Sequence, residues 1–394
     1  MLTRQGWLAL WGGIGLLVLA RLLGIGELYV LGAVLLLLLV VAALYVRLTR
    51  LDIHVDRAVH PARVHVGQLS RVEVRVRNLR ATATPVLRLR DAVTGTTGAE
   101  LLVPPLDQGT VSVASYRLPT DRRGIIRVGP LKVVVGDPFG LVQSSVQAAP
   151  RVEVTVLPRI DDVRPVPLTT GHDPLAGVLQ PHALGRVGDD FYALRAYVVG
   201  DDLRRIHWPS TARHDELLVR QQEQPWQGRT TVLLDVRRAA HDGRSLEDAV
   251  SAAASIVAAN SARRDLVRLA TTDGADSGFG SGTMHLHALL EHLAVVEASG
   301  SASLRSMIDV VQRDGQGALV LVVGQTADDE LRATTRLRQR FGMVSVVRVG
   351  AGAAGRPPAA SVIAVGDDAP FAPAWNQAMA VAARSAPGMA RTAR

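Results

Sequence analysis

The chain has 394 residues, a length that allows two or three folded units. Hydrophobic residues make up 48% of the sequence and charged residues 20%, so the chain can build substantial cores and is not disordered overall. The sequence contains no cysteine, which excludes disulfides, thiolate catalysis and cysteine-ligated zinc. A net charge of +8 suits a protein that works beside an anionic membrane surface.

The first element in the chain is a pair of apolar segments, Trp7–Leu23 and Leu28–Val46, separated by a short glycine-containing turn. Each segment is long enough to cross a hydrocarbon core of about 30 Å at 1.5 Å per residue. They predict a transmembrane helical hairpin within residues 1–50, with the lipid bilayer as a partner. The alternative is a signal peptide cleaved after Val18-Leu19-Ala20 and followed by a single anchor, which the second apolar segment makes less attractive.

Positive charges flank the outer ends of the two segments and are sparse in the turn between them. The flanking arginines are Arg4, Arg47, Arg50 and Arg57, whereas the turn carries Arg21 beside Glu27. Because short cytoplasmic flanks are enriched in arginine and lysine, this asymmetry predicts that both ends lie in the cytoplasm. We therefore expect a protein of the cytoplasmic membrane with its soluble domains inside the cell.

Residues 51–158 have a strand-like pattern with no helical period. Short runs of alternating or β-branched residues are punctuated by proline, glycine, aspartate and threonine. These runs are 70–77, 85–90, 111–118, 131–135 and 151–157. Several short strands at this spacing predict a small antiparallel β-sandwich, whose topology the pattern leaves open. The alternating arginines of 71–77 indicate a solvated sheet face rather than a phosphate track, so no nucleic acid is expected.

Beyond a connecting segment at 159–227, the pattern changes to strands that alternate with helices. The expected strands are 230–235, 266–271, 318–323, 344–349 and 361–365. The expected helices are 245–264, 285–297, 303–313, 328–340 and 370–383. This alternation predicts a doubly wound α/β domain over 228–385 with a largely parallel sheet, followed by a tail at 386–394.

A carboxylate follows the first strand of this α/β domain, at the sheet edge where open α/β folds bind ligands. Asp235 stands where von Willebrand factor A domains carry Asp-x-Ser-x-Ser, whose oxygens hold Mg²⁺ directly or through water. Arg237 and Ala239 occupy the two hydroxyl positions, and a guanidinium repels a cation and can pair with Asp235 itself. We therefore favour a salt-bridged Asp235 in a degenerate site and expect no metal or other cofactor. Thr271-Thr272-Asp273 and Gln325-Thr326 lie near later strand ends and could donate oxygens.

The densest polar stretch runs from Gly188 to Glu223, where acidic and basic residues are interleaved with aromatics. Such a segment can form an ordered, ion-paired loop. It is either a structural latch between the soluble domains or a docking surface for a protein partner. The residues singled out for this role are Arg195, Tyr197, Gly200, Asp201, Arg204, Trp208 and Arg213.

An enzymatic alternative rests on a polar cluster within the same stretch. His207 and Ser210 lie close together with Asp201 nearby, which suggests an enzyme acting on cell-envelope material. A hydrolase triad needs an exposed nucleophile and an oxyanion hole, and no Gly-x-Ser-x-Gly sequence is present. His285 and His287 are spaced by two rather than by the four that suit a helical metal site, and no phosphate-binding loop motif occurs. We expect no catalytic residues.

The same stretch resembles a known family signature. Residues 194–208 read Leu-Arg-Ala-Tyr-Val-Val-Gly-Asp-Asp-Leu-Arg-Arg-Ile-His-Trp and are followed by Thr211-Ala212-Arg213. Together with Asp137-Pro138-Phe139-Gly140-Leu141 upstream, they resemble the domain of unknown function 58 family. The resemblance implies a von Willebrand A-like domain in the C-terminal half. It also implies work beside a MoxR-type AAA+ ATPase, because family members are often encoded next to such ATPases.

The sequence therefore predicts a non-enzymatic, membrane-tethered interaction protein of unknown pathway. Its suggested role is that of an adaptor with a MoxR-type AAA+ ATPase in assembling or maturing envelope or protein complexes. The alternatives are the envelope enzyme and a lipid-binding protein that uses its scattered arginines.

Overall fold

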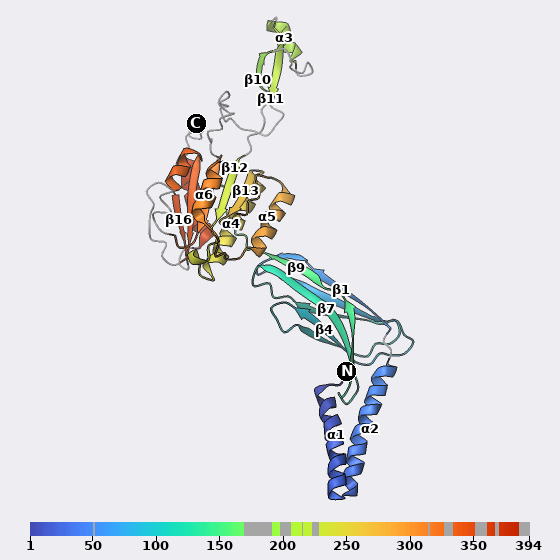
Figure 1. Ribbon diagram of the computed structural model, residues 1–394. Coiled ribbons are helices and arrows are strands. Elements are labelled where there is room, and N and C mark those ends of the chain that lie inside the picture. The colour runs from blue at the N-terminus through green and yellow to red at the C-terminus, as the bar shows by residue number, and fades with distance from the viewer. Residues whose placement is uncertain are drawn as a thin grey trace. The chain divides into compact units, whose positions relative to one another are not determined.

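The computed structural model describes residues 1–49, 52–168, 191–197, 206–214, 216–222, 228–313, 316–326, 334–350, 361–366 and 370–385. The chain divides into two compact units, Met1–Arg159 with Leu290–Val295, and Ile160–Leu289 with Val296–Arg394. The first contains two apolar helices and a β-rich region, and the second contains an α/β region (Figure 1). The predicted tail at 386–394 lies outside the described residues.

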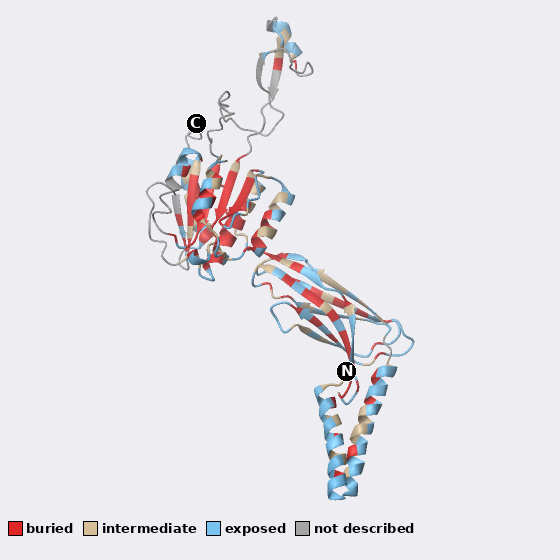
Figure 2. Ribbon diagram, viewed as in Figure 1, coloured by how far each residue is buried: buried red, intermediate tan, exposed pale blue. Residues whose placement is uncertain are grey.

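Two antiparallel helices open the chain, α1 (Arg4–Leu23) and α2 (Gly26–Leu48). Gly24 ends α1 in the left-handed conformation at φ 70°, which a glycine adopts without strain, and the chain reverses there. Both helices are long and apolar enough to cross a membrane, and only 17% of each apolar window is buried. This exposure separates them from the core helices of a soluble fold (Figure 2).

Small residues bring the two helices together. Gly13 of α1 faces Gly32 of α2, and a Cβ added at Gly32 would lie 2.9 Å from Leu17 and 3.0 Å from the carbonyl oxygen of Gly13. A side chain at either glycine would therefore push the helices apart. Close backbone approach through glycine is how apolar helices associate in lipid, where burial of apolar surface gives no driving force.

Two sheets that share one hydrophobic core form the β-rich region. One sheet has the order β1-β3-β6, and the other has the order β2-β9-β7-β4-β5 with β8 also paired to β7. The strands are β1 (Ile53–His60), β2 (Arg63–His65), β3 (Arg71–Asn78), β4 (Leu87–Val93), β5 (Ala99–Val103), β6 (Val111–Arg117), β7 (Gly124–Gly136), β8 (Gln143–Ala149) and β9 (Val152–Leu157). Alternate residues of β3 and β4 are buried, as the alternating sequence predicted.

The prediction of purely antiparallel pairing is wrong at one edge of the larger sheet. β2 pairs with β9 in parallel, with Val64 beside Val156. Two parallel strands cannot be joined by a tight hairpin, so their pairing depends on contacts between distant segments that the local pattern does not encode. Burial of Val64, which is 2% exposed, anchors this short strand in the shared core.

Arg57 belongs to the β-rich core rather than to the membrane flank. Its guanidinium pairs with Asp91 at 3.0 Å, and both side chains are 1% exposed. Tyr116 donates its hydroxyl to the same carboxylate at 2.7 Å, and burial of this phenol raises its pKa far above the ordinary value. Of the four arginines expected to flank the apolar helices, Arg57 therefore forms a buried ion pair within the β-rich region instead.

The second unit is built on a five-stranded sheet of the order β13-β12-β14-β15-β16, in which every pair is parallel. Its strands are β12 (Arg229–Leu234), β13 (Leu266–Thr271), β14 (Ala318–Val323), β15 (Met343–Val349) and β16 (Ser361–Val365). Its main helices are α4 (Ser245–Ala262), α5 (Thr283–Val295), α6 (Leu304–Arg313) and α8 (Phe371–Ser385). The central strands are almost completely buried (Figure 2), and the predicted βα alternation is confirmed.

Part of the predicted connecting segment packs onto this unit. Val166 is 1% exposed, and its backbone N–H donates to the side-chain oxygen of Asn260 in α4 at 3.1 Å. The indole Nε1 of Trp375 in α8 donates to the carbonyl oxygen of Arg164 at 2.8 Å. These contacts join the extended chain before residue 169 to two helices.

The helix expected at 328–340 is seen only in its second half. Thr334–Gln339 forms a 3-10 helix, labelled η3, in which Leu337 is fully buried. The expected residues 328–333 lie outside the described residues.

Candidate functional site

The parallel sheet brings the ends of three strands together at one edge. β12 lies between β13 and β14, so the order of the strands along the chain reverses beside β12. The carboxyl ends of strands at such a reversal are where open α/β sheets bind ligands. Asp235 follows β12, Thr272 follows β13 and Thr326 lies just beyond β14.

Arg237 holds the carboxylate of Asp235. Its Nε donates to both carboxylate oxygens at 3.0 and 3.1 Å, and its terminal amino group donates to Oδ2 at 2.9 Å. The backbone N–H of Arg237 adds a further bond to Oδ1 at 3.0 Å. The Asp235 side chain is fully buried and that of Arg237 is 18% exposed. The salt-bridged Asp235 expected from the sequence is therefore confirmed.

Hydroxyls from the two neighbouring strand ends complete this arrangement. The Thr272 hydroxyl donates to Asp235 at 3.3 Å and also accepts the backbone N–H of Val236 at 2.9 Å. The Thr326 hydroxyl accepts a bond from Arg237 at 3.3 Å, and its carbonyl oxygen accepts one from Arg348 at 3.1 Å. Of the residues that the sequence indicated near the later strand ends, Thr272 and Thr326 contact this site, whereas the Thr271 hydroxyl donates to Asp273 instead.

One residue at the Asp235 site, His241, was not predicted from the sequence. The ring of His241 contacts the carbonyl oxygen of Asp235 through Nε2 at 2.7 Å and the hydroxyl of Ser245 through Nδ1 at 3.1 Å. The one-turn 3-10 helix η2 (Arg238–Ala240) folds the chain back so that His241 reaches the strand end. Nothing in the residue pattern marks this short turn, so the contact could not be foreseen.

The Asp235 carboxylate finds its charge partner and its hydrogen-bond donors within the chain. The Arg237 guanidinium neutralises the Asp235 carboxylate, and the Thr272 hydroxyl and the backbone N–H of Arg237 also donate to its Oδ1. A divalent cation would have to displace a bidentate guanidinium from a buried position. No group of three or more histidine or acidic side chains able to hold a metal occurs within the described parts of the chain.

The family-like signature forms a second candidate site, on a small hairpin. β10 (Phe191–Ala196) pairs antiparallel with β11 (Leu218–Gln222), and helix α3 (Trp208–His214) lies between them in the chain. Ile206 bridges to Val219, and these two residues are 6% and 4% exposed. The backbone N–H of Tyr197 donates to the carbonyl oxygen of Leu217 at 2.7 Å.

Two of the signature residues are exposed on this hairpin. Trp208 is 64% exposed at the start of α3, and Arg213 is exposed near its end. The backbone of Arg195 lies in β10 opposite Val219. Gly200, Asp201 and Arg204 lie outside the described residues, so the structure does not test the ion pairs expected there.

Of the predicted enzymatic cluster, the structure brings His207 and Ser210 together. The Nδ1 of His207 lies 2.8 Å from the hydroxyl oxygen of Ser210. The third member, Asp201, lies outside the described residues. His285 contacts the carbonyl oxygen of Val267 through Nε2 at 2.8 Å, a contact that fastens α5 to β13.

These features define a chain with two exposed apolar helices, a β-rich region and an α/β region whose switch-point carboxylate is held by an internal arginine. Residues 193–366 match the model of the family described as Protein of unknown function DUF58. This match confirms the resemblance seen in the signature.

The remaining comparisons add little. No curated protein matches the chain. The CARDB domain of the PF1109 protein from Pyrococcus furiosus is 22% identical, with 27% of this chain and 94% of that chain covered and a TM-score of 0.22. Alkylpurine DNA glycosylase AlkC from Pseudomonas fluorescens is 12% identical, with 29% and 33% covered and a TM-score of 0.20. Likenesses this partial say nothing about function.

Proposed function

We propose that this chain is a non-enzymatic, membrane-anchored adaptor that binds a protein partner through its signature hairpin. The exposure of Trp208 carries the proposal. A tryptophan that is 64% exposed at the start of a short helix presents a large apolar surface to solvent. Tryptophan and arginine are enriched among the residues that dominate protein-binding energy, and Arg213 is exposed on the same helix.

The anchor in this proposal is the pair α1 and α2. Their length, apolar composition and exposure support two membrane spans. Arg4 and Arg47 at the outer ends support an orientation with both ends in the cytoplasm. Residues 53–385 would then lie on the cytoplasmic side of the cytoplasmic membrane.

The α/β region in this proposal is a von Willebrand A-like domain whose metal site has been replaced. The bidentate pair between Arg237 and Asp235 supports this reading, because the guanidinium stands where the A-domain motif has a hydroxyl ligand. Binding to a partner would then proceed without a bridging cation. The partner implied by the family resemblance is a MoxR-type AAA+ ATPase.

The test is recovery of that ATPase from detergent extracts by the tagged full-length protein. Trp208→Ala and Arg213→Glu should each reduce recovery, with a loss of about 2 kcal/mol or thirtyfold for a hot-spot tryptophan. Met284→Ala and Arg305→Glu are matched controls, because both residues are exposed on other helices of the second unit. Equal recovery by the hairpin variants and the controls would refute docking through the hairpin.

A second function is favoured by one contact only. The 2.8 Å separation between His207 Nδ1 and Ser210 Oγ is the geometry of a base beside a hydroxyl nucleophile. A fluorophosphonate probe that labelled the wild type and failed to label Ser210→Ala would favour an enzyme acting on envelope material. Absence of labelling in the native protein would remove this candidate.

A further inference from the structure

A cavity of about 950 Å³ lies where the outer ends of α1 and α2 meet the β-rich region, within the first unit. Thr3, Arg4 and Tyr45 line it from the helical side, and Arg88 and Leu102 line it from β4 and β5. The backbone fixes this wall in place, because the N–H of Thr3 donates to the carbonyl oxygen of Leu141 at 2.9 Å. The cavity is therefore built from both the anchor and the domain it carries.

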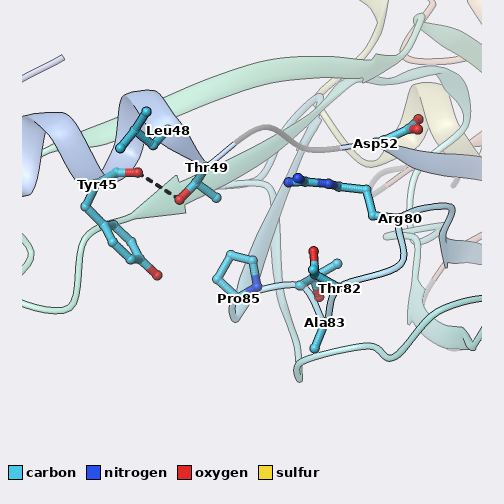
Figure 3. A pocket seen from close by; sticks show the side chains of 9 residues that line it. Tyr45, Leu48, Thr49, Asp52, Arg80, Thr82, Ala83 and Pro85 are labelled. Atoms are coloured by element: carbon cyan, nitrogen blue, oxygen red, sulfur yellow. Dashed lines mark hydrogen bonds between the residues drawn. The ribbon is translucent and has the colours of Figure 1, made fainter.

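A second cavity of about 490 Å³ adjoins the first and shares Tyr45 and Pro85 with it. Figure 3 shows Tyr45 and Thr49 at the end of α2 on one side and Arg80 reaching toward them from the other. We refer to these two cavities together as the groove, which lies between the outer ends of the two helices and the β-rich region.

The charge lining the larger cavity is positive. Arg4 is exposed and has no ion-pair partner among the described residues. Arg88 is also exposed and pairs with Glu100 through Nε at 3.0 Å, which leaves its terminal amino groups for another anion. Asp137 also lines the cavity, but it is only 6% exposed, and its carboxylate accepts the backbone N–H groups of Phe139 at 2.8 Å and Val142 at 2.5 Å.

Apolar and aromatic side chains surround these arginines. Leu102 and Val86 line the cavity and are 66% and 55% exposed, and Phe139 on the adjacent loop is 58% exposed. On the helices, Trp7 and Tyr45 are exposed within the turns that face this end. Tryptophan and tyrosine are enriched at the level of lipid headgroups, so the residues place this end of the helices at the membrane surface.

We propose that this groove binds an anionic phospholipid, with the phosphate held by Arg4 and Arg88 and the acyl chains against the apolar helices. The inference rests on the proposed membrane anchoring and adds a lipid class to it. Two guanidinium groups at headgroup level match a phosphate that carries a further negative group nearby. The exposed Leu102, Val86 and Phe139 would contact the upper acyl chain region, where their apolar surface is not exposed to water.

The test uses the full chain reconstituted in phosphatidylcholine nanodiscs that contain increasing fractions of phosphatidylglycerol. The measurement is the amount of phosphatidylglycerol retained per protein in native mass spectrometry, together with the thermal midpoint. The test variant is Arg4→Gln/Arg88→Gln. The matched control is Arg21→Gln/Arg90→Gln, which removes the same charge at the far end of α1 and at the other β4 arginine that faces Glu100.

Wild type and control should retain phosphatidylglycerol and gain thermal stability as its fraction rises. The test variant should bind it roughly 25-fold more weakly, because each arginine near an anionic surface contributes about fivefold. If that variant fails to fold, the single substitutions Arg88→Gln and Arg90→Gln carry the same comparison.

Equal retention by the test variant and the control would overturn the lipid site while leaving the anchor intact. Equal stabilisation of the wild type by soluble glycerol phosphate would overturn the choice of a bilayer lipid as the ligand. Failure of the wild type to enter nanodiscs would instead refute the anchoring on which the inference depends.

Discussion

Removing the Arg237 side chain leaves a buried carboxylate without its counter-charge. The Asp235 side chain is fully buried, and Arg237→Ala deletes three hydrogen bonds to it, at 2.9, 3.0 and 3.1 Å. Breaking a buried ion pair by deleting one partner costs about 3–5 kcal/mol. The backbone N–H of residue 237 and the Thr272 hydroxyl still donate, and Arg237 is 18% exposed, so we expect about 3 kcal/mol, the lower end of this range.

Hydrogen exchange measured by mass spectrometry on the full chain resolves this loss within β12 and β14. The double variant Asp235→Asn/Arg237→Ala should lose less than Arg237→Ala, because it buries no charge. Arg238→Ala is the control, since the side chain of that neighbouring arginine is exposed and its guanidinium donates to the carbonyl oxygen of Ala298, at 3.3 Å. A loss for Arg237→Ala within about 0.5 kcal/mol of the control would refute the claim that the guanidinium stabilises the buried carboxylate.

Two further predictions concern the same unit. Arg237→Ser/Ala239→Ser restores the hydroxyls of the A-domain motif. Mg²⁺ at a hundredfold excess over its Kd should therefore stabilise this variant by about 2.7 kcal/mol, as measured by hydrogen exchange. No stabilisation by Mg²⁺ would contradict the interpretation of this region as an A-like domain. The hydrogen bond from Arg268 lowers the pKa of Asp276, so the pair contributes stability above the unfolded value near 3.9, which is lost as pH falls through the folded value. Asp276→Asn should cost about 1 kcal/mol at neutral pH and flatten this acid-side slope in denaturant titrations; an unchanged slope would contradict the assignment.

The strands of the α/β sheet could be predicted because burial on both faces leaves continuous apolar runs in the sequence. Leu266–Thr271 and Ala318–Val323 were expected with the bounds that the structure has. The strand Gln143–Ala149 was missed, because most of its residues are polar or exposed and they do not alternate between apolar and polar. Arg57 was assigned to the membrane flank because its partner Asp91 is distant in sequence and only the fold brings the two together.

The Asp235 site was predictable to the extent that its contacts are local. Arg237 is two residues from Asp235, so their pairing follows from the sequence itself. Thr272 and Thr326 were among the five residues indicated near the later strand ends, because parallel strands end at a common edge; the sequence did not say which of the five would reach Asp235. His241 was missed, since its position depends on the path of a one-turn helix, and the exposure of Trp208 depends on how the hairpin packs rather than on composition.

Site-specific photocrosslinking in intact cells, from a crosslinking amino acid placed at position 208, tests the adaptor role most directly. The proposal predicts one dominant adduct with an AAA+ ATPase, formed from position 208, which is 64% exposed, and absent when the crosslinker stands at position 284, which is 81% exposed. The same adducts from both positions, or none from position 208 in a protein that is folded and membrane-bound, would contradict docking through the signature hairpin.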